Sequence, residues 1–318
     1  MVSRGIAYEA KLKFYDFVDD YPEMAAEAAG TATESSPGVP LKMRFSNHSY
    51  GPPAGWIKTS EIIGGNIYNY TNWLGPKDLA GEDPEFGAYT WDSKTIDTII
   101  YHAQTYLPVF AAGNDAADQS LSPDGPSFAS YGVGRKYVFP DDSENRSKLM
   151  HPHDGGSAVV AFPTPYDVSP NIASGIESAV LGLAFDTLPS TACAKNNISV
   201  GAVYGSRDGE NIPELIGLSH FSSRGPTDDG RVKPDLVGPA TFVAPPLEQI
   251  QGGGTSFAAP VITGTLALLG EINHDNGGPS RLASSWKALI LNTAIDCTKI
   301  TFLDERNFDE NGDPQDYA

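Results

Sequence analysis

The sequence predicts an α/β protein with three layers, in which a mostly parallel sheet has helices on its faces. The first observation is a pair of segments that predict strands, at 41–46 and at 107–112, of which the second is short and apolar. The second observation is the segment 93–106 between them, which repeats isoleucine and alanine at helical spacing. Because a strand, a helix and a strand follow one another, the strands are expected to be parallel. With 318 residues, 40% of them hydrophobic, the chain can bury a large core.

The other elements follow from shorter patterns. Residues 4–18 predict a turn that leads into a strand, and the alanine-rich segment 22–32 predicts a helix with acidic residues near its start. Residues 51–91 predict a long surface loop, because they are rich in Gly, Asn, Asp and aromatic residues, and 115–190 shows little regular pattern. A strand, a run of turns, a buried apolar helix and a last helix are expected at 194–203, 221–235, 257–270 and 284–293. Without an internal repeat or a low-complexity linker, we expect a single domain over residues 1–318, ending in a peripheral acidic tail.

Composition excludes several classes of partner. The net charge is −19, from 40 acidic and 21 basic residues, which argues against binding to nucleic acid or to an anionic membrane. No apolar run approaches the roughly 20 residues of a membrane span, and the first residues have no apolar signal-peptide core. Cys193 and Cys297 make neither a disulfide framework nor a metal cluster, and whether they pair is left open.

Two polar residues stand where chemistry is expected. The run Gly252–Gly254 predicts a tight backbone corner before the apolar helix, so Ser256 lies at a helix N-terminus, where free N–H groups favour a developing negative charge. Ser256 is then a helix cap or a nucleophile, and its own neighbourhood favours the cap. Asn114 follows the strand 107–112, at the strand end where parallel sheets bind ligands. Its amide can join a helix N–H group around an oxyanion, although by itself Asn114 is a turn residue.

Five motifs, taken in order along the chain, resemble those of the subtilisin-like serine peptidases. The serine motif is the most specific of the five. Sedolisins share its Gly-Thr-Ser, but the Phe-Ser-Ser-Arg-Gly-Pro run makes them a poor second. The motifs cover Gly5–Leu12, Ser46–Gly51, Ala111–Asn114, Phe221–Pro226 with Lys233–Asp235, and Gly254–Pro260.

The resemblance implies roles for particular residues. It makes Ser256 the nucleophile of a serine endopeptidase that forms an acyl-enzyme, with Asn114 as the side-chain donor of the oxyanion hole. The substrate would be an extended polypeptide that pairs with two strand-like walls. The residues implied to bind it are Ser49, Tyr50, Gly51, Ala111, Ala112, Gly113 and Thr255.

The same resemblance sets expectations about the whole protein. It implies a monomer that is secreted or extracellular and needs no cofactor for its chemistry. Many members of the family bind structural calcium. The carboxylate-rich loops at Asp141–Asp142 and Asp228–Asp229 can serve that purpose, or equally be solvated turns. The cluster His151–Asp154 has metal-ligand residue types but is interpreted as a solvated turn on a Gly/Pro-rich loop.

The catalytic base and acid of the family are not found. In the family they come from an Asp-Ser/Thr-Gly motif and a His-Gly-Thr-His motif, and neither occurs in this sequence. Alternation along the strand turns His48 away from the cleft, His102 is expected to be partly buried in its helix, and His220 is expected to pack at the following turn.

We therefore expect a peptidase truncated at its N-terminus. The alternative is a pseudoenzyme that binds extended peptides without cutting them. The chain by itself is expected to have little or no activity. It is also expected to be poorly soluble, because the missing strands would leave a sheet edge unpaired.

Overall fold

The computed structural model describes residues 5–30, 44–63, 66–73, 83–116, 138–140, 147–150, 186–204, 216–219, 221–243, 251–295 and 302–303. Its main sheet has six strands in the order β1-β4-β7-β8-β12, with β9 also paired to β7. The pairs β1–β4, β4–β7, β7–β9 and β8–β12 are parallel, and β7–β8 is antiparallel. The strands are β1 (Phe45–His48), β4 (Leu107–Ala111), β7 (Ile198–Tyr204), β8 (Gly217–Ser219), β9 (Leu236–Pro239) and β12 (Phe302–Leu303).

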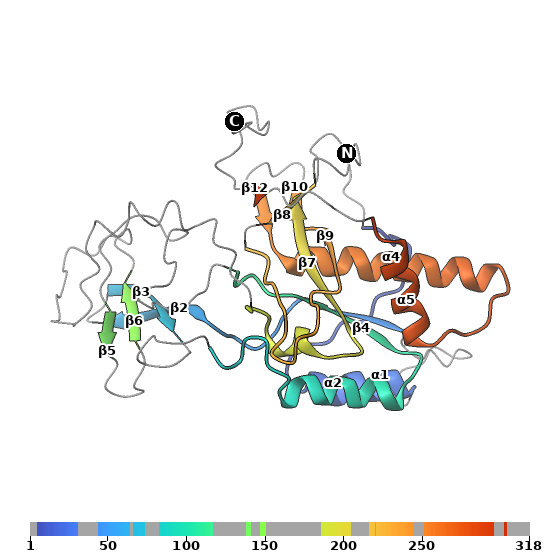
Figure 1. Ribbon diagram of the computed structural model, residues 1–318, viewed down its shortest axis with the longest axis horizontal. Helices are drawn as coiled ribbons and strands as arrows, with labels where there is room; N and C mark the ends of the chain where they lie inside the picture. The colour runs from blue at the N-terminus through green and yellow to red at the C-terminus, as the bar shows by residue number, and fades with distance from the viewer. Residues whose placement is uncertain are drawn as a thin grey trace.

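Helices cover the sheet on two sides, so the predicted α/β architecture is confirmed (Figure 1). On one side α1 (Asp20–Ala29) packs beside α2 (Trp91–His102), and the short 3-10 helix η1 (Ser190–Cys193) contacts α2. On the other side α4 (Thr255–Asp275) crosses β1, β4, β7 and β9, and α5 (Ala283–Thr293) contacts β4. The helices expected at 22–32, 93–106 and 284–293 are therefore present as α1, α2 and α5.

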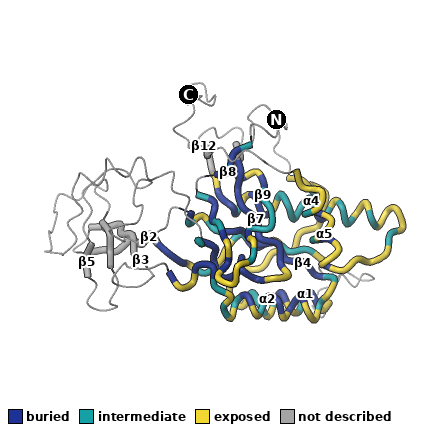
Figure 2. The backbone as a smooth tube through the Cα atoms, in the orientation of Figure 1, coloured by how far each residue is buried: buried dark blue, intermediate teal, exposed yellow. Residues whose placement is uncertain are grey.

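The core lies where these layers meet. Every residue of β4 is buried, as its apolar sequence requires of a strand covered on both faces. Side chains of α2, β7, α4 and α5 complete one cluster. Figure 2 shows β4 and β7 largely in the dark blue of buried residues, with partly exposed helices around them. Its fully buried large members are Ile96, Tyr106, Leu107, Val109, Phe110, Ile198, Val200, Leu266 and Trp286.

A second, antiparallel sheet replaces part of the expected long loop at 51–91. It has the order β2-β3-β6-β5, with β2 (Trp56–Ile63), β3 (Asn66–Trp73), β5 (Val138–Pro140) and β6 (Ser147–Met150). The register runs from Trp56 opposite Trp73 to Ile63 opposite Asn66. The loop prediction is wrong here because β-branched and aromatic residues on either side of Gly64-Gly65 are a hairpin pattern.

The strand expected within residues 4–18 is absent. Among the described residues of this segment, a turn closes from Ala10 N–H to the Ala7 carbonyl, and no strand follows it. Leu12 and Phe14 are 73% and 83% exposed. Alternating apolar residues form a strand only where a neighbouring strand accepts their hydrogen bonds, and this segment has no such neighbour in the described structure.

The apolar helix α4 differs from the expectation in two ways. It begins at Thr255, directly after β11 (Gln251–Gly253), which pairs with β10 (Thr241–Val243), so Gly252 and Gly253 belong to a strand rather than a corner. It is also not a buried helix. Its only buried residues are Thr255, Ala258, Ala259 and Leu266. By length and composition, α4 is the one helix of the described chain that could cross a membrane, and here it packs against a sheet.

Candidate active site

Ser256 occupies the second position of α4. The N-cap is Gly254 in an extended conformation, so the interpretation of Ser256 as the helix cap is wrong. The N–H groups of a first helical turn have no partner within the helix, and the helix dipole adds positive potential there. The half-buried Ser256 side chain thus lies beside backbone donors that suit a developing negative charge.

Thr255 joins the start of α4 to the turn that follows β4. Its backbone N–H donates to Asn114 Oδ1 at 2.9 Å, and its hydroxyl lies 3.2 Å from both Asn114 Oδ1 and the Gly113 carbonyl. The hydroxyl oxygen in turn accepts from Gly113 N–H at 3.2 Å. Thr255 is fully buried, so these bonds hold the two backbone segments together in a dry environment.

The contacts of Thr255 fix the orientation of the exposed Asn114 amide. Asn114 Oδ1 is the end bonded to Thr255 at the start of α4, so the amide NH₂ is left to donate elsewhere, and both Nδ2 and Oδ1 lie close to the cap residue Gly254. Asn114 Nδ2 lies 3.5 Å from the position where a Cβ would stand on Gly254. The structure therefore brings Asn114 and Ser256 to the same helix end, as the sequence predicted for two residues far apart in the chain.

Ser49 and Ser256 exchange two hydrogen bonds. Ser256 Oγ donates to the Ser49 carbonyl at 3.0 Å, and Ser49 Oγ donates to the Ser256 carbonyl at 2.7 Å. We call residues Ser49–Gly51 the substrate wall. The wall continues β1 and is thereby attached to the first turn of α4, next to the hydroxyl of Ser256.

Glycines allow close packing behind the two expected walls. Gly113 has φ +97°, and a Cβ there would stand 2.7 Å from Ser223 Oγ and 2.9 Å from Pro189 Cδ. A Cβ on Gly51 would stand 2.9 Å from Thr191 Oγ1. Both walls therefore pack against the segment 189–191 through positions that admit no side chain. Ala111 and Ala112, also expected at the second wall, are buried at the end of β4.

The carboxyl group of Asp115, next to Asn114, was not among the residues predicted from the sequence. Burial raises the pKa of Asp115 to about 6, against hydrogen bonds involving Asn114 and Ser223, which lower it. Asp115 N–H donates to Ser223 Oγ at 2.9 Å, and Ser223 N–H donates to the Gly113 carbonyl at 3.0 Å. Ser223 belongs to the Phe-Ser-Ser-Arg-Gly-Pro motif, so this motif holds the Asn114 turn in place.

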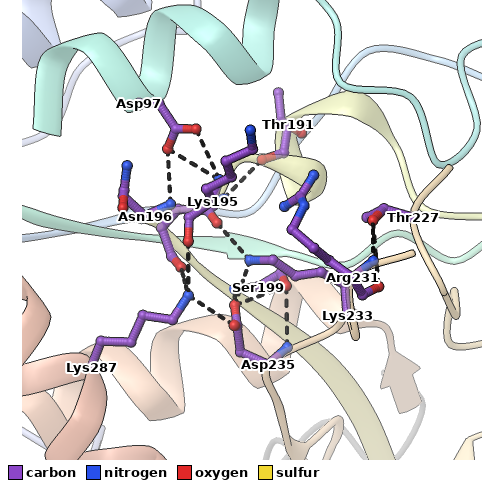
Figure 3. A network of polar contacts seen from close by, with 11 residues as sticks. Asp97, Thr191, Lys195, Asn196, Ser199, Thr227, Arg231, Lys233, Asp235 and Lys287 are labelled. Atoms are coloured by element: carbon purple, nitrogen blue, oxygen red, sulfur yellow. Dashed lines mark hydrogen bonds and ion pairs between the residues drawn. The ribbon is translucent and has the colours of Figure 1, made fainter. Parts of the chain in front are cut away.

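The Lys-Pro-Asp motif forms a buried ionic network (Figure 3). Lys233 Nζ contacts Asp235 Oδ2 at 2.6 Å and Asn197 Oδ1 at 2.9 Å, and Lys287 of α5 contacts Asp235 Oδ1 at 2.8 Å. Burial lowers the pKa of Lys233 to about 8, although Asp235 opposes the shift. Asp235 also accepts from Ser199 N–H at 2.8 Å. This network anchors the segment after the Ser-Ser-Arg-Gly-Pro turn to β7 and α5.

The histidines of the described chain offer no base to Ser256. His48 is 6% exposed and stacks on Phe110 with ring centroids 4.4 Å apart, so it faces away from Ser256, as predicted. His102 ends α2 and is exposed, which corrects the expectation of a partly buried residue. His274 is exposed near the far end of α4. His151, His153 and His220 lie outside the described residues.

The other candidate sites are simpler. Cys193 is a buried free thiol, and burial raises its pKa to about 12, while Cys297 lies outside the described residues. No group of three or more metal-ligating side chains occurs in the described part of the chain. Asp229, one of the calcium candidates, pairs with Arg231 at 2.8 Å, and Asp141–Asp142 lie outside the described residues.

A parallel sheet with a serine at a helix N-terminus and an asparagine amide beside it is an arrangement suited to acyl transfer. The sequence model of the subtilase family matches residues 2–315, so the chain belongs to the subtilase family of serine peptidases. The serine protease/ABC transporter B family protein tagD of Dictyostelium discoideum is 24% identical over 332 residues. That match covers 91% of this chain and 16% of tagD, so the chain spans about a sixth of that protein's length.

Solved protease structures resemble the chain more distantly. The Clostridium perfringens CspB protease is 20% identical, with a TM-score of 0.39, over 68% of this chain and 60% of that one. The prenylagaramide maturation protease PagA is 16% identical, with a TM-score of 0.34, over 90% of this chain and 60% of that one.

Proposed function

We propose that this chain carries the nucleophile and the oxyanion donor of a subtilisin-like serine endopeptidase, while the general base and its orienting acid are not among its residues. The observation that supports this most is the bond from Thr255 N–H to Asn114 Oδ1, because it holds Asn114 at the helix end that bears Ser256 and leaves the amide NH₂ as a donor. Membership in the subtilase family supports peptide-bond hydrolysis as the reaction.

In the proposed reaction, Ser256 Oγ attacks the carbonyl carbon of the scissile peptide bond and loses its proton to a base. The negative charge that forms on the carbonyl oxygen is stabilised by Asn114 Nδ2 and by the N–H of Ser256 in the first turn of α4. The N–H groups of Thr255 and Phe257 already donate to Asn114 Oδ1 and to the Gly254 carbonyl. The C–N bond then breaks, the amine leaves with the proton, and the acyl group stays on Oγ until water releases it.

The substrate in this proposal is an extended polypeptide lying along the substrate wall. Strand addition of this kind uses backbone hydrogen bonds for affinity and side-chain pockets for selectivity. The Ser49 carbonyl, which accepts from Ser256 Oγ in the structure, belongs to that wall.

The first test supplies the missing base from solution. Ser256 should react slowly with a fluorophosphonate probe, and added imidazole should increase the labelling rate in proportion to its concentration. Ser256→Ala should abolish the labelling. Asn114→Ala should retain the nucleophile but lower any imidazole-assisted peptide hydrolysis about 10²–10³-fold, as loss of one oxyanion donor does.

Two results would contradict the proposal. Rapid cleavage of casein by the chain alone, abolished by Ser256→Ala, would show that a base is present after all. Labelling that persists in the Ser256→Ala variant would remove Ser256 from the nucleophile role.

A second candidate is a peptide-binding pseudoenzyme. One observation favours it: the Ser256 hydroxyl donates its proton to a backbone carbonyl, which cannot act as a base. The imidazole experiment separates the two, because a pure binding protein would bind fluorescein-labelled casein without any labelling or cleavage at Ser256.

A further inference from the structure

The strand that leads into the substrate wall has different polar contacts on its two faces. Side chains alternate along a strand, so Asn47 and Ser49 face α4, where Ser49 bonds the Ser256 carbonyl. Ser46, His48 and Tyr50 face the opposite side. The three residues of this second face are linked to each other, and Ser256 takes no part in their contacts.

The second face forms one chain of hydrogen bonds, which we call the Tyr50 relay. Tyr106 OH lies 2.5 Å from Ser46 Oγ, and Ser46 Oγ lies 2.7 Å from His48 Nε2. His48 Nδ1 lies 2.8 Å from Tyr50 OH, so both ring nitrogens of His48 have a partner. The relay starts at Tyr106, which is fully buried, and ends at Tyr50, which is 38% exposed at the wall.

Packing holds the imidazole in this relay. The His48 ring lies nearly parallel to the Phe110 ring, at an interplanar angle of 13°, and the two residues are direct partners in the β1–β4 register. The Tyr50 ring meets the His48 ring edge to face, with centroids 5.5 Å apart. Burial lowers the pKa of His48 to about 4, so the ring is neutral at pH 7, with one nitrogen as donor and the other as acceptor.

A carboxylate gives the relay its direction. Burial, as the largest cause, and the negative charges of the nearby carboxylates of Asp20 and Glu23 raise the pKa of Tyr50. An ionised carboxylate only accepts hydrogen bonds. We infer that Tyr50 O–H points toward the Asp20 carboxylate, which leaves the Tyr50 oxygen to accept from His48 Nδ1–H in the 2.8 Å contact between them. Ser46 O–H then donates to Nε2, and Tyr106 O–H donates to Ser46.

From this geometry, the structure assigns His48 as a positioning residue for the substrate wall, acting through the hydroxyl of Tyr50. The assignment rests on the proposed role of Ser49–Gly51 in binding peptide. Preorganising a binding strand lowers the entropy lost when the peptide adds to it. His48 preorganises Ser49–Gly51 from the face of this strand that is turned away from Ser256, and it takes no part in proton transfer.

The first experiment tests the relay independently of peptide binding. Nitrogen-15 and carbon-13 shifts of His48 in the whole chain should report the neutral Nδ1–H tautomer at pH 7. In Tyr50→Phe the ring should lose this fixed tautomer, because its acceptor is gone. An Nε2–H tautomer, or a charged ring at pH 7, would overturn the direction of the relay.

The second experiment tests positioning with two replacements of the same residue. His48→Asn keeps an amide near the place of Nδ1, and His48→Gln keeps one near the place of Nε2. Binding of fluorescein-labelled casein, measured by anisotropy, should weaken about five- to tenfold in His48→Gln and in Tyr50→Phe, and less in His48→Asn. Combining His48→Gln with Tyr50→Phe should weaken binding no further, since both changes remove one interaction.

Amide hydrogen exchange at Ser49–Gly51 gives a readout that needs no ligand. It should become faster in His48→Gln and Tyr50→Phe but not in Tyr101→Phe, a matched control on an exposed part of α2. Equal loss of binding in His48→Asn and His48→Gln, with unchanged exchange at the wall, would reduce His48 to a packing residue. If the wild-type chain does not bind casein, the proposed function fails and the positioning role fails with it. The measured tautomer of His48 still tests the relay in that case, because it needs no peptide.

Discussion

The helices α2 and α4 differ from what their compositions suggest: α2 is the more polar helix but buries one face fully, whereas α4 is the more apolar helix but is partly exposed. In α2 polar residues outnumber apolar ones, yet Ile96, Ile99 and Ile100 are buried against the sheet. Nearly every residue of α4 up to Gly270 is uncharged and most are apolar, yet Phe257, Leu268 and Ile272 are 39%, 37% and 56% exposed. Periodicity predicted which face of α2 is covered. Composition predicted that α4 is buried on all sides, but the described residues pack against only part of its surface.

Three of the four buried residues of α4 lie at one end, and the fourth is Leu266. Thr255, Ala258 and Ala259 are buried, and they lie where the helix meets the Asn114 turn and the sheet. Farther along, Gly264 packs against Ile6 of the N-terminal segment, at 2.9 Å from the position of a Cβ on Gly264. The site thus depends on the well-packed end of α4, and the apolar remainder contributes little to it.

The largest effect is expected in α2. Ile96→Ala removes a fully buried side chain and should lower the free energy of unfolding by about 2–5 kcal/mol, measured by urea denaturation. Thr98→Ala, on the exposed face of the same helix, is the control and should stay within about 0.5 kcal/mol of the wild type. A cost below about 1 kcal/mol for Ile96→Ala would show that α2 does not pack on the sheet as described.

A smaller effect is expected beside the buried end of α4, at Asp115. Its pKa of about 6 in the folded chain lies above the value of about 3.9 for an unfolded aspartate, so the folded state binds the proton more tightly. The ionised carboxylate then costs stability above pH 6, and the cost disappears as the pH falls from about 6 to about 4.

Asp115→Asn should therefore stabilise the chain by about 2 kcal/mol at pH 7.5 and by little at pH 4. Urea denaturation at both pH values measures the difference, and Glu9→Gln, at an exposed position of the N-terminal segment, serves as the control. A gain that is the same at both pH values would mean that the carboxyl is not buried in the folded chain.

The smallest effect on stability is expected at the exposed end of α4. Ile272→Glu should change the free energy of unfolding by less than about 0.5 kcal/mol and increase the soluble fraction, because it breaks up an exposed apolar face. His274→Glu adds negative charge to the same helix without removing an apolar side chain. If Ile272→Glu costs more than about 2 kcal/mol while His274→Glu does not, this face of α4 is covered in the folded protein.

The local sequence pattern was enough to predict an element where apolar residues recur at helical spacing or where a strand is apolar throughout. The isoleucines of 93–106 predicted α2, and the apolar run 107–112 predicted β4, which Asn114 follows shortly after its end. Pattern misled where pairing decides the structure. Residues 10–16 alternate like a strand but have no neighbour among the described residues to pair with, and the residues around Gly64-Gly65 pair as a hairpin inside an expected loop.

The sequence by itself determined the family, the fold class and the two residues proposed for chemistry, because the motifs around Ser256 and Asn114 are local. Only the tertiary structure decided how these residues are held. It made Gly254 rather than Ser256 the cap of α4, turned the Asn114 amide through Thr255, and placed His48 in a relay behind the substrate wall. The bond between Thr255 and Asn114 joins residues 141 positions apart, and the contact of Ser46 with Tyr106, which starts the relay, joins residues 60 apart. Hydrogen bonds of that kind exist only once the sheet and the helices have packed together.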